Sequence, residues 1–308
     1  MADPAIVGIA NPFAANRSAG RYARRLERSL RNAGLDYGTR FTKGPLDATR
    51  IARELVDGGV EIVVSIGGDG TLNEIVNGAM GASERARNTA RLAIAQVGTG
   101  TDFSRTVQQT SNPGEIHERL RRGRHRPIDV GLVEYTNLRG EPETRYFVNI
   151  AEFGSGGAVV EKVNRTTKVF GGRVSFLLGI LTTMPKYRNK HVEWRLEVGD
   201  SGAGTVNNFV VANGRYFGGG LLPAPHAELD DGLFDIVVIG DLDWKTIRKH
   251  LKDLRRGTHL AIPQVTFRRS SEVFTTSREH ALLDLDGELV GRDPTRFVCV
   301  PKGLNLVV

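Results

Sequence analysis

The segment GGDGTLNEIVNG, residues 67–78, constrains the fold of this chain more than any other feature. It follows the apolar run EIVVSI, residues 61–66, whose β-branched side chains predict a buried strand. Glycine lets a backbone approach a ligand closely and adopt φ values closed to other residues. A helix N-terminus offers unpaired N–H groups and a positive dipole end, which suit phosphate. The segment therefore predicts a strand, a tight turn and a short helix at a phosphate-binding site.

The segment lacks the Gly-Lys-Ser/Thr sequence of a Walker A loop. Backbone amides would therefore hold the phosphate, and the carboxylate of Asp69 would be left for other work. A plain strand-to-helix turn is the alternative for a lone Gly-Gly-x-Gly segment. The presence of Asp69, Thr71, Asn73, Glu74 and Asn77 together favours a binding site over that alternative.

Length and composition indicate a globular protein of two domains. The chain has 308 residues, 40% of them hydrophobic and 25% charged. No apolar run approaches the ~18 residues of a membrane span, and the N-terminus lacks the pattern of a secretory signal. The single cysteine, Cys299, excludes an internal disulfide and is expected to alternate with Phe297 on a core strand. These features predict a cytoplasmic protein.

The charge balance favours anionic partners. The chain has 42 Lys and Arg against 35 Asp and Glu, giving a net charge of +7 and a pI near 9.7. Nucleotides, nucleic acid and an anionic membrane surface would all be attracted. No zinc-finger spacing, aromatic RNA-binding strand or recognition helix is found in the sequence, so no nucleic-acid partner is expected. A basic amphipathic helix over residues 244–256 could simply solvate its charges, or it could hold a peripheral protein on the inner membrane surface.

Residues 1–133 alternate strand and helix patterns, which predicts an α/β domain with a parallel, helix-covered sheet. Strands are expected at residues 5–10, 37–42, 61–66, 92–97 and 129–133, and helices at residues 21–33, 47–57 and 113–122.

Residues 134–296 are dominated by strand-like runs, which predicts a mainly antiparallel, sandwich-like β domain. Strands are expected at residues 146–151, 194–198, 206–212, 234–239, 265–268, 273–276, 281–285 and 297–300, and two helices at residues 172–187 and 244–256.

The segment at residues 67–78 resembles the signature of the diacylglycerol kinase-type lipid kinases, which include bacterial soluble diacylglycerol kinases and sphingosine kinases. NAD kinases and phosphofructokinases share the shorter Gly-Gly-Asp-Gly core, whereas the Asn-Glu-x-x-Asn-Gly extension is similar to the lipid branch. The resemblance implies transfer of the γ-phosphoryl group of ATP to a lipid hydroxyl, with Mg²⁺ as cofactor. It also implies that residues 297–308 return to the first domain.

Two other segments of the first domain are similar to this family. Asn11 begins an Asn-Pro segment that closes the first strand, as in the family's Asn-Pro-x-Ser-Gly, although an insertion lengthens it here. GTGTDFSR, residues 98–105, follows another strand and resembles Gly-Thr-x-Asn-Asp-Phe-Ala-Arg. Thr101 stands where the family usually has Asn, and its hydroxyl offers fewer hydrogen bonds than an amide. Asp102 and Arg105 match the family.

The second domain carries two acidic segments that match the family. LDDG, residues 229–232, is good turn chemistry by itself, and the resemblance adds Asp231 and, less directly, Asp230 to a metal-linked network. DLDGE, residues 284–288, would place Asp284, Asp286 and Glu288 on one face if it is a single strand. Such a row could be a solvated edge or an active site. The resemblance favours Asp286 as general base with Glu288 as its partner.

The expected site therefore has three groups of residues. Catalysis would use Asp69, Asp286 and Glu288, and Mg²⁺ would be bound by Asp69, Asp102 and Asp231, since hard cations prefer oxygen ligands. The nucleotide would be bound by Asn11, Gly67, Gly68, Gly70, Thr71, Asn73, Glu74, Gly98, Thr99, Gly100 and Arg105.

Other functions stay open at this point. The most direct interpretation is a kinase for diacylglycerol or a related glycerolipid, which would meet its lipid substrate at a membrane surface. A kinase for a soluble acceptor such as NAD, a non-catalytic nucleotide or lipid sensor prompted by Thr101, and generic anion binding are the alternatives. The sequence leaves a homodimer open.

Overall fold

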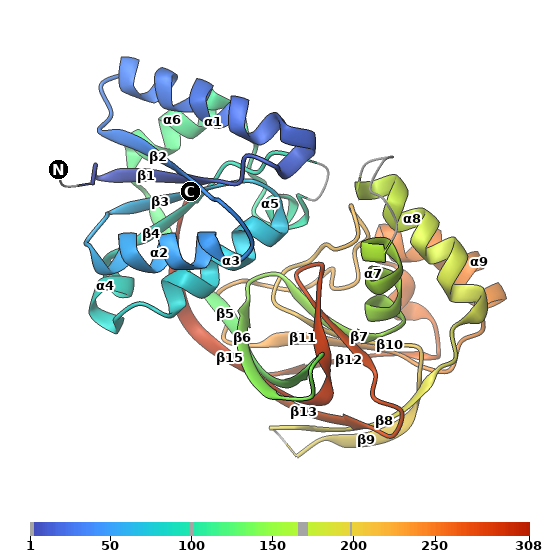
Figure 1. Ribbon diagram of the computed structural model, residues 1–308. Helices are drawn as coiled ribbons and strands as arrows, with labels where there is room; N and C mark the ends of the chain where they lie inside the picture. The colour runs from blue at the N-terminus through green and yellow to red at the C-terminus, as the bar shows by residue number, and fades with distance from the viewer. Residues whose placement is uncertain (1–2, 99–100, 166–171, 198) are drawn as a thin grey trace. The chain divides into compact units, whose positions relative to one another are not determined.

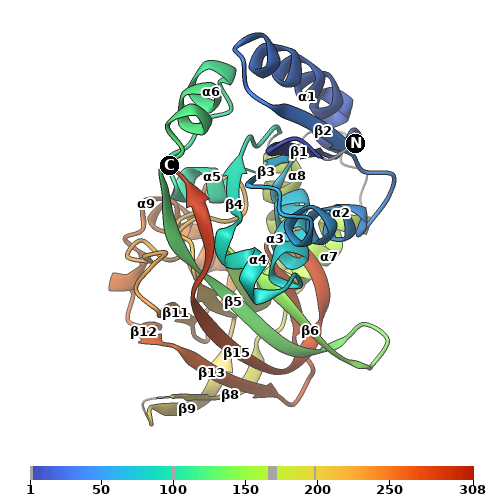
Figure 2. The ribbon, with the colours of Figure 1, turned by 90° about the vertical axis from the view of Figure 1, so that its left-hand side faces the viewer.

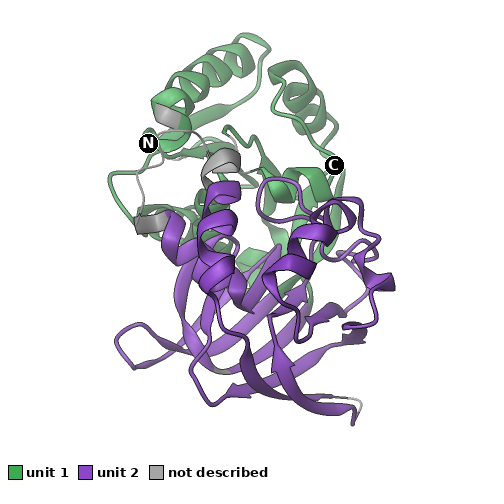
Figure 3. Ribbon diagram, turned by 90° about the vertical axis from the view of Figure 1, so that its right-hand side faces the viewer, with its two compact units in different colours: residues 1–130, 301–308 green, residues 131–300 purple. Residues whose placement is uncertain are grey.

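The computed structural model describes residues 3–98, 101–165, 172–197 and 199–308. The chain forms two compact units (Figure 3): unit 1 comprises residues 1–130 and 301–308, and unit 2 comprises residues 131–300. Each unit has a buried apolar core of its own.

Unit 1 contains a parallel sheet, as expected from its alternating pattern. Its strand order is β15-β4-β3-β1-β2, and each neighbouring pair runs parallel. Figure 2 shows the end of β15 beside β4, where Asn305 and Leu306 pair with Arg91 and Leu92. The strands are β1 (Ile6–Ala10), β2 (Tyr37–Phe41), β3 (Ile62–Ile66), β4 (Arg91–Ile94) and the last residues of β15 (Glu288–Val307).

Helices cover both faces of this sheet (Figure 1). Leu26 and Leu30 of α1 and Ile116 of α6 pack with the strands in one buried cluster, whereas α2 and α3 contact β1 and β3 from the other side. Helix α1 begins seven residues before the expected start, at Ala14. The helices are α1 (Ala14–Asn32), α2 (Asp47–Asp57), α3 (Asp69–Met80), α4 (Glu84–Thr89), α5 (Asp102–Thr106) and α6 (Pro113–Arg122).

The second half of the GGDGTLNEIVNG segment holds α3 against α2. A Cβ atom on Gly78 would lie 2.8 Å from the Ala52 Cβ, so only glycine permits this close packing. The Glu74 carboxylate accepts a hydrogen bond from the Ala48 amide at 3.1 Å, in the first turn of α2. Helix α2 has no side-chain cap of its own, so Glu74 supplies its capping acceptor.

Unit 2 is an antiparallel β sandwich, as expected. One layer has the order β12-β11-β10-β7-β14-β15, and the other joins β9, β8, β13, β15, β5 and β6, with β15 contributing to both. The additional strands are β5 (His125–Asn137), β6 (Pro142–Phe147), β7 (Ile150–Gly154), β8 (Lys190–Leu196), β9 (Ser201–Val206), β10 (Asn208–Ala212), β11 (Phe234–Ile239), β12 (Val265–Ser270), β13 (Glu272–Ser277) and β14 (Leu282–Leu285).

Alternation along the strands builds the core of unit 2. In β10, Phe209 and Val211 face the cluster between the layers, whereas Val210 and Ala212 face a second cluster on the outer side. Phe153 stacks on Phe209 with 4.9 Å between ring centroids. Cys299 is buried in the same core as Phe297, as its alternation predicts.

Two expected strands prove to be two strands each. Residues 146–151 are divided between β6 and β7, because the backbone leaves the ladder at Val148 and Asn149. Residues 206–212 are divided between β9 and β10 at Asn207. In both places the amides bond elsewhere: Asn207 donates its N–H to Ile239 O, and Val148 and Asn149 donate theirs to the Asp286 carboxylate.

A third apolar cluster joins the helices of unit 2. Val159 of α7, Ile180 of α8 and Met184 pack together with Trp244 and Ile247 of α9. Helix α7 was not expected from the sequence. The helices are α7 (Ser155–Arg165), α8 (Gly172–Thr183), η1 (Met184–Lys186), α9 (Trp244–Arg256) and η2 (His259–Ala261). No helix within the described ranges is long and apolar enough to cross a membrane.

Candidate functional site

Several of the expected nucleotide-binding residues of unit 1 gather at one edge of its sheet. Asn11 follows β1, the Gly67–Gly68 turn follows β3, and Gln96 follows β4. Because these strands are parallel neighbours, their carboxyl ends share an edge. β1 has β2 on one side and β3 on the other, so the strand order reverses between β1 and β3. Open α/β sheets bind ligands at such a switch point.

The turn between β3 and α3 is built for close backbone approach. A Cβ atom on Gly67 would lie 2.5 Å from the Thr71 Oγ1, so a larger residue cannot be placed there without displacing Thr71. Gly68 is the extended N-cap residue of α3 and makes no side-chain capping bond. The first amides of α3 have no acceptor within the helix and can face an anion.

Asp69 lies at this helix start and is fixed by β4 and α5. Its Oδ1 accepts a hydrogen bond from the Gln96 amide nitrogen at 2.6 Å, and its Oδ2 accepts one from the Asp102 backbone N–H at 3.3 Å. The Gln96 Oε1 in turn accepts bonds from the N–H and the hydroxyl of Ser104, at 3.1 and 2.5 Å. The carboxylate is therefore held in one orientation, partly exposed.

Gln96 and Ser104 were missed by the sequence analysis. Gln96 is only 3% exposed although it ends an apolar strand. A buried amide side chain needs partners, so a glutamine among the apolar residues of a strand was the available signal.

Asp102 and Arg105 lie together on α5. The Arg105 Nε is 3.5 Å from the Asp102 Oδ1, and the Asp102 side chain is buried. The structure thus brings Asp102 to Asp69 through its backbone N–H, with a guanidinium beside it.

The remaining expected residues of unit 1 are placed differently. Asn11 Oδ1 accepts the Phe13 N–H at 3.0 Å and shapes the turn after β1. Asn73 is fully buried and receives the Asn77 amide at 3.2 Å, while Glu74 caps α2. Gly98 has a φ of +134°, which requires glycine. Thr99 and Gly100 lie outside the described residues.

In unit 2, the strand register places the second group of expected residues along one sheet edge. Asp286 directly follows β14, Asn149 precedes β7, and Asn213 follows β10. The register pairs Leu285 with Ala151 and Ile150 with Ala212, so these ends are adjacent.

Asp286 sits in a cradle of backbone amides. Its Oδ1 accepts the N–H groups of Asn149 and Ile150, and its Oδ2 accepts that of Val148, each at 3.0 Å. Its own N–H donates to Ile150 O at 2.9 Å. These bonds explain the break between β6 and β7.

The expectation of three carboxylates on one face of a single strand was wrong. The chain reverses at Asp286 and Gly287, whose φ values of 51° and 87° are those of a two-residue hairpin turn. Glu288 begins the return strand and pairs with Leu285. It forms an ion pair with Arg145 at 2.6 Å, and Asp286 and Glu288 have separate sets of partners.

Asp231 is engaged by protein groups on both oxygens. Its Oδ1 accepts the Leu233 N–H at 3.0 Å, and its Oδ2 pairs with Arg269. Arg269 also lies 3.2 Å from Asp235, a carboxyl whose pKa burial raises to about 6. A metal role for Asp231 stays a prediction.

Next to the cradle lies a buried pair of acids. Asp284 and Glu152 are register partners on β14 and β7, and both are almost fully buried. The Asn208 amide donates to Glu152 Oε2 at 2.6 Å. Burial raises the pKa of Glu152 to about 7 and, together with the charge of Glu152, raises the pKa of Asp284 well above its ordinary value.

This pair should make stability depend on pH. A carboxyl with a higher pKa in the folded state binds more protons when folded, so its contribution to stability falls as pH rises from 4.5 through about 7. Glu152→Gln cannot ionise and keeps the bond to Asn208. Its free energy of unfolding relative to wild type should improve by up to roughly 3 kcal/mol between about pH 4.5 and about pH 8.5, because a tenfold change in proton affinity corresponds to about 1.4 kcal/mol.

Denaturant unfolding of both proteins at the two pH values measures this change. Glu193→Gln, at an exposed position on β8, is the matched control and should show no such trend. A difference between Glu152→Gln and wild type that stays constant with pH would contradict the assignment.

Comparison with known proteins agrees with this architecture. The family model described as "Diacylglycerol kinase catalytic domain" matches residues 5–133, and that described as "YegS C-terminal NAD kinase beta sandwich-like domain" matches residues 149–308. The chain is 26% identical over 301 residues to the "Diacylglycerol kinase" of Bacillus subtilis (strain 168), covering 97% of this chain and 95% of that protein. It is 30% identical over 279 residues to the "Probable lipid kinase YegS-like" of Stenotrophomonas maltophilia (strain K279a), covering 90% and 88%.

A solved structure of a diacylglycerol kinase candidate from Bacillus anthracis str. Sterne has the same fold, with a TM-score of 0.79 at 23% identity over 98% of this chain and 94% of that one. Matches along both units define a class of two-domain lipid kinases. The chain belongs to the diacylglycerol kinase and YegS-like lipid kinase family.

Proposed function

We propose that this protein transfers the γ-phosphoryl group of ATP to a hydroxyl of a lipid, diacylglycerol or a related glycerolipid. The observation that carries the proposal is the fixed carboxylate of Asp69 at the N-terminus of α3, beside the switch point of the sheet. Phosphoryl transfer depends chiefly on positioning and on neutralising charge, and this edge offers both.

On this proposal the nucleotide phosphates contact the backbone at Gly67, Gly68 and Gly70, because the turn leaves no room for larger side chains at its first position. Helix α3 adds its N-terminal amides and dipole. Arg105 supplies a cation close to Asp102.

The same edge fits Mg²⁺ bound mainly through water and phosphate. Among the described residues no group of three or more His, Cys, Asp or Glu side chains could form a protein-only metal site. Mg²⁺ commonly uses one or two carboxylates and the phosphates of the substrate, and Asp69 and Asp102 would supply these. The ion would neutralise charge on the phosphates.

In unit 2 the acceptor hydroxyl would give its proton to Asp286. The three amide bonds fix this carboxylate and keep it ready to accept a proton in one direction. Glu288 and Arg145 form an ion pair beside the same hairpin.

The lipid character of the acceptor is supported by the names of the relatives. The Bacillus subtilis relative is a diacylglycerol kinase, and it is matched along almost all of its length. The acceptor is therefore assigned to the glycerolipids, and NAD is the alternative to be tested against them.

The test is ATP-dependent phosphorylation of a panel of lipids in mixed micelles with Mg²⁺, with NAD as a soluble acceptor in a parallel reaction. Phosphate should appear on diacylglycerol or a related glycerolipid and on no other class. Phosphorylation of NAD alone would replace the proposal by the soluble-acceptor function. Tight ATP binding with no product on any acceptor would point to a sensor.

A further inference from the structure

Helix α8 exposes three neighbouring leucines. Leu177, Leu178 and Leu181 are 48%, 45% and 42% exposed. Their spacing of one and four residues places them on the same side of the helix. The opposite side carries Phe176 and Ile180, which pack in the apolar cluster with α7 and α9. Single exposed apolar residues are common, but three adjacent ones on a helix mark an interaction surface.

Helix α9 exposes a row of cations. Trp244, Ile247 and Leu254 of this helix pack in the same cluster as α8. The ion pair found on α9 in the described structure joins His250 to Asp253 and neutralises none of the exposed cations. These are Lys245, Arg248, Lys249, Lys252, Arg255 and Arg256.

The two helices lie on one flank of unit 2 (Figure 1). Exposed Lys186 and Arg188, directly after α8, add to the positive charge there. The combination of apolar side chains and clustered cations is the pattern of a surface that binds an anionic bilayer.

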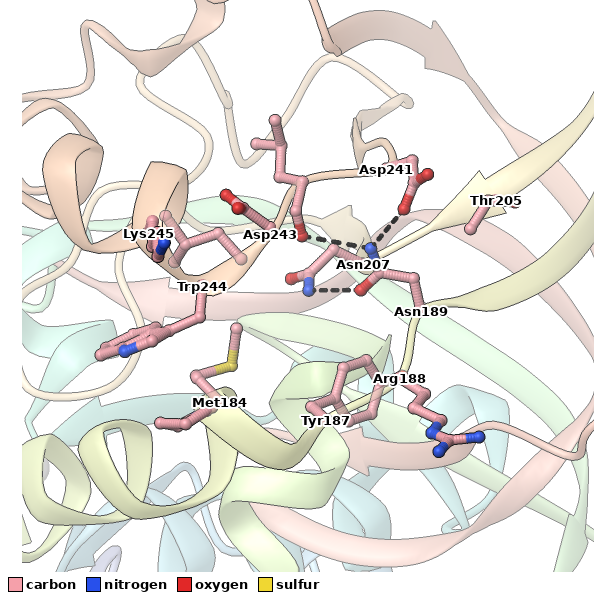
Figure 4. A pocket seen from close by; sticks show the side chains of 13 residues that line it. Met184, Tyr187, Arg188, Asn189, Thr205, Asn207, Asp241, Asp243, Trp244 and Lys245 are labelled. Carbon is pink, nitrogen blue, oxygen red and sulfur yellow. Dashed lines mark hydrogen bonds between the residues drawn. The ribbon is translucent and has the colours of Figure 1, made fainter.

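A cavity of about 680 Å³ opens between the end of α8 and the start of α9 (Figure 4). Its amide groups are already bonded to protein: Asn189 donates to Asp241 at 2.7 Å, and Asn207 donates to Asn189 at 2.8 Å. The groups that remain for a ligand are apolar, as at Met184 and Trp244, or cationic, at Arg188 and Lys245. An amphiphile with an anionic headgroup matches this lining.

We propose that the α8–α9 face, formed by the three leucines and the cations of α9, docks this protein on a bilayer that contains anionic phospholipid. The leucines enter the interface and the cations face the headgroup phosphates. The inference rests on the proposed function, since a kinase for a glycerolipid must reach an acceptor in a membrane. A symmetric contact between two copies is disfavoured, because it would bring the two rows of cations together.

Co-sedimentation with vesicles tests the docking without ATP. Wild-type protein should bind vesicles of phosphatidylcholine mixed with phosphatidylglycerol, bind weakly to phosphatidylcholine alone, and lose affinity as salt increases. The triple variant Leu177→Ser, Leu178→Ser, Leu181→Ser should need at least tenfold more lipid for half-maximal binding. Lys245→Gln with Lys249→Gln and Lys252→Gln should remove the preference for phosphatidylglycerol.

The matched control is Leu138→Ser with Arg139→Gln, exposed residues between β5 and β6, which should bind like wild type. Equal binding by wild type and the triple variants would overturn the proposal. Light scattering checks the alternative occupant: a wild-type dimer that the leucine variant dissociates, without a change in vesicle binding, would assign the face to self-association.

An activity assay separates this proposal from the proposed function. With a short-chain diacylglycerol in solution the leucine variant should turn over like wild type, and with long-chain diacylglycerol in vesicles it should be at least tenfold slower. Wild-type binding to vesicles without any kinase activity would leave the docking face standing and remove the proposed reaction. Kinase activity with unchanged vesicle turnover in the variant would do the reverse.

Discussion

Replacing Asp69 with Ala is expected to lower kcat/KM for ATP-dependent phosphoryl transfer by roughly a thousandfold or more, because the loss removes a fixed charge at the phosphate-binding edge. The measurement is steady-state turnover with varied ATP and Mg²⁺. The variant also leaves the Gln96 amide, which is buried, without its 2.6 Å acceptor. An unpaired buried donor costs about 1–3 kcal/mol, so thermal unfolding must be measured in parallel.

Two further variants separate chemistry from stability. Asp69→Asn retains the size of the side chain and one acceptor for Gln96, and should lose almost as much activity as Asp69→Ala with a smaller loss of stability. Asp57→Asn is the control, because Asp57 ends α2, precedes β3 and therefore lies at the opposite edge of the sheet. Normal turnover in Asp69→Asn would refute the assigned role of the carboxylate.

Asp286→Asn is expected to lower kcat by roughly 10²- to 10⁴-fold while the KM for ATP changes little, which is the effect of removing a general base. Asn tolerates the left-handed conformation found here, with φ 51°. Its amide group would, however, face a backbone N–H in place of one carboxylate oxygen, so one of the three bonds to residues 148–150 would be lost. Some loss of stability is therefore expected together with the loss of activity.

Gly287→Ala distinguishes the two effects. Gly287 has a φ of 87° and no heavy atom within 4 Å of an added Cβ, so the substitution strains the hairpin and leaves the Asp286 carboxylate in place. It should lower the unfolding temperature and retain most of kcat. If Gly287→Ala lost as much activity as Asp286→Asn at a similar unfolding temperature, Asp286 would be a structural residue and not the base.

The sequence predicted those elements whose signals are local. The bounds expected for the helices at residues 47–57, 113–122 and 244–256 are the ones observed, because their apolar spacing and end residues agree. The parallel sheet of unit 1 and the sandwich of unit 2 followed from the change in strand and helix pattern near residue 133.

Features set by distant partners could not be predicted in this way. The division between β6 and β7 depends on bonds to Asp286, 137 residues from Asn149. Helix α7 begins Ser155-Gly156-Gly157, a sequence typical of a loop. Its glycines are needed because Gly156 lies against the Glu152 carboxylate and Gly157 against Leu282.

The site was predicted in part. Asp69 and Asp102 are brought together as expected, whereas Glu74 contacts α2 and the partners of Asp69 include a glutamine that no motif indicated. The polar groups that orient a carboxylate come from neighbouring strands, and single-sequence patterns carry no information about which strands are neighbours.

β15 has a consequence for how the protein is made. The strand begins at Glu288 in unit 2 and ends at Val307 in unit 1, where it covers β4. A ribosome therefore completes the whole of unit 2 before it releases the strand that finishes the nucleotide-binding sheet. Until then β4 is an open parallel edge, with unpaired N–H and C=O groups that can recruit strands from other chains. The first unit to be synthesised is thus the last to be closed, and during that interval the nascent chain depends most on protection from aggregation.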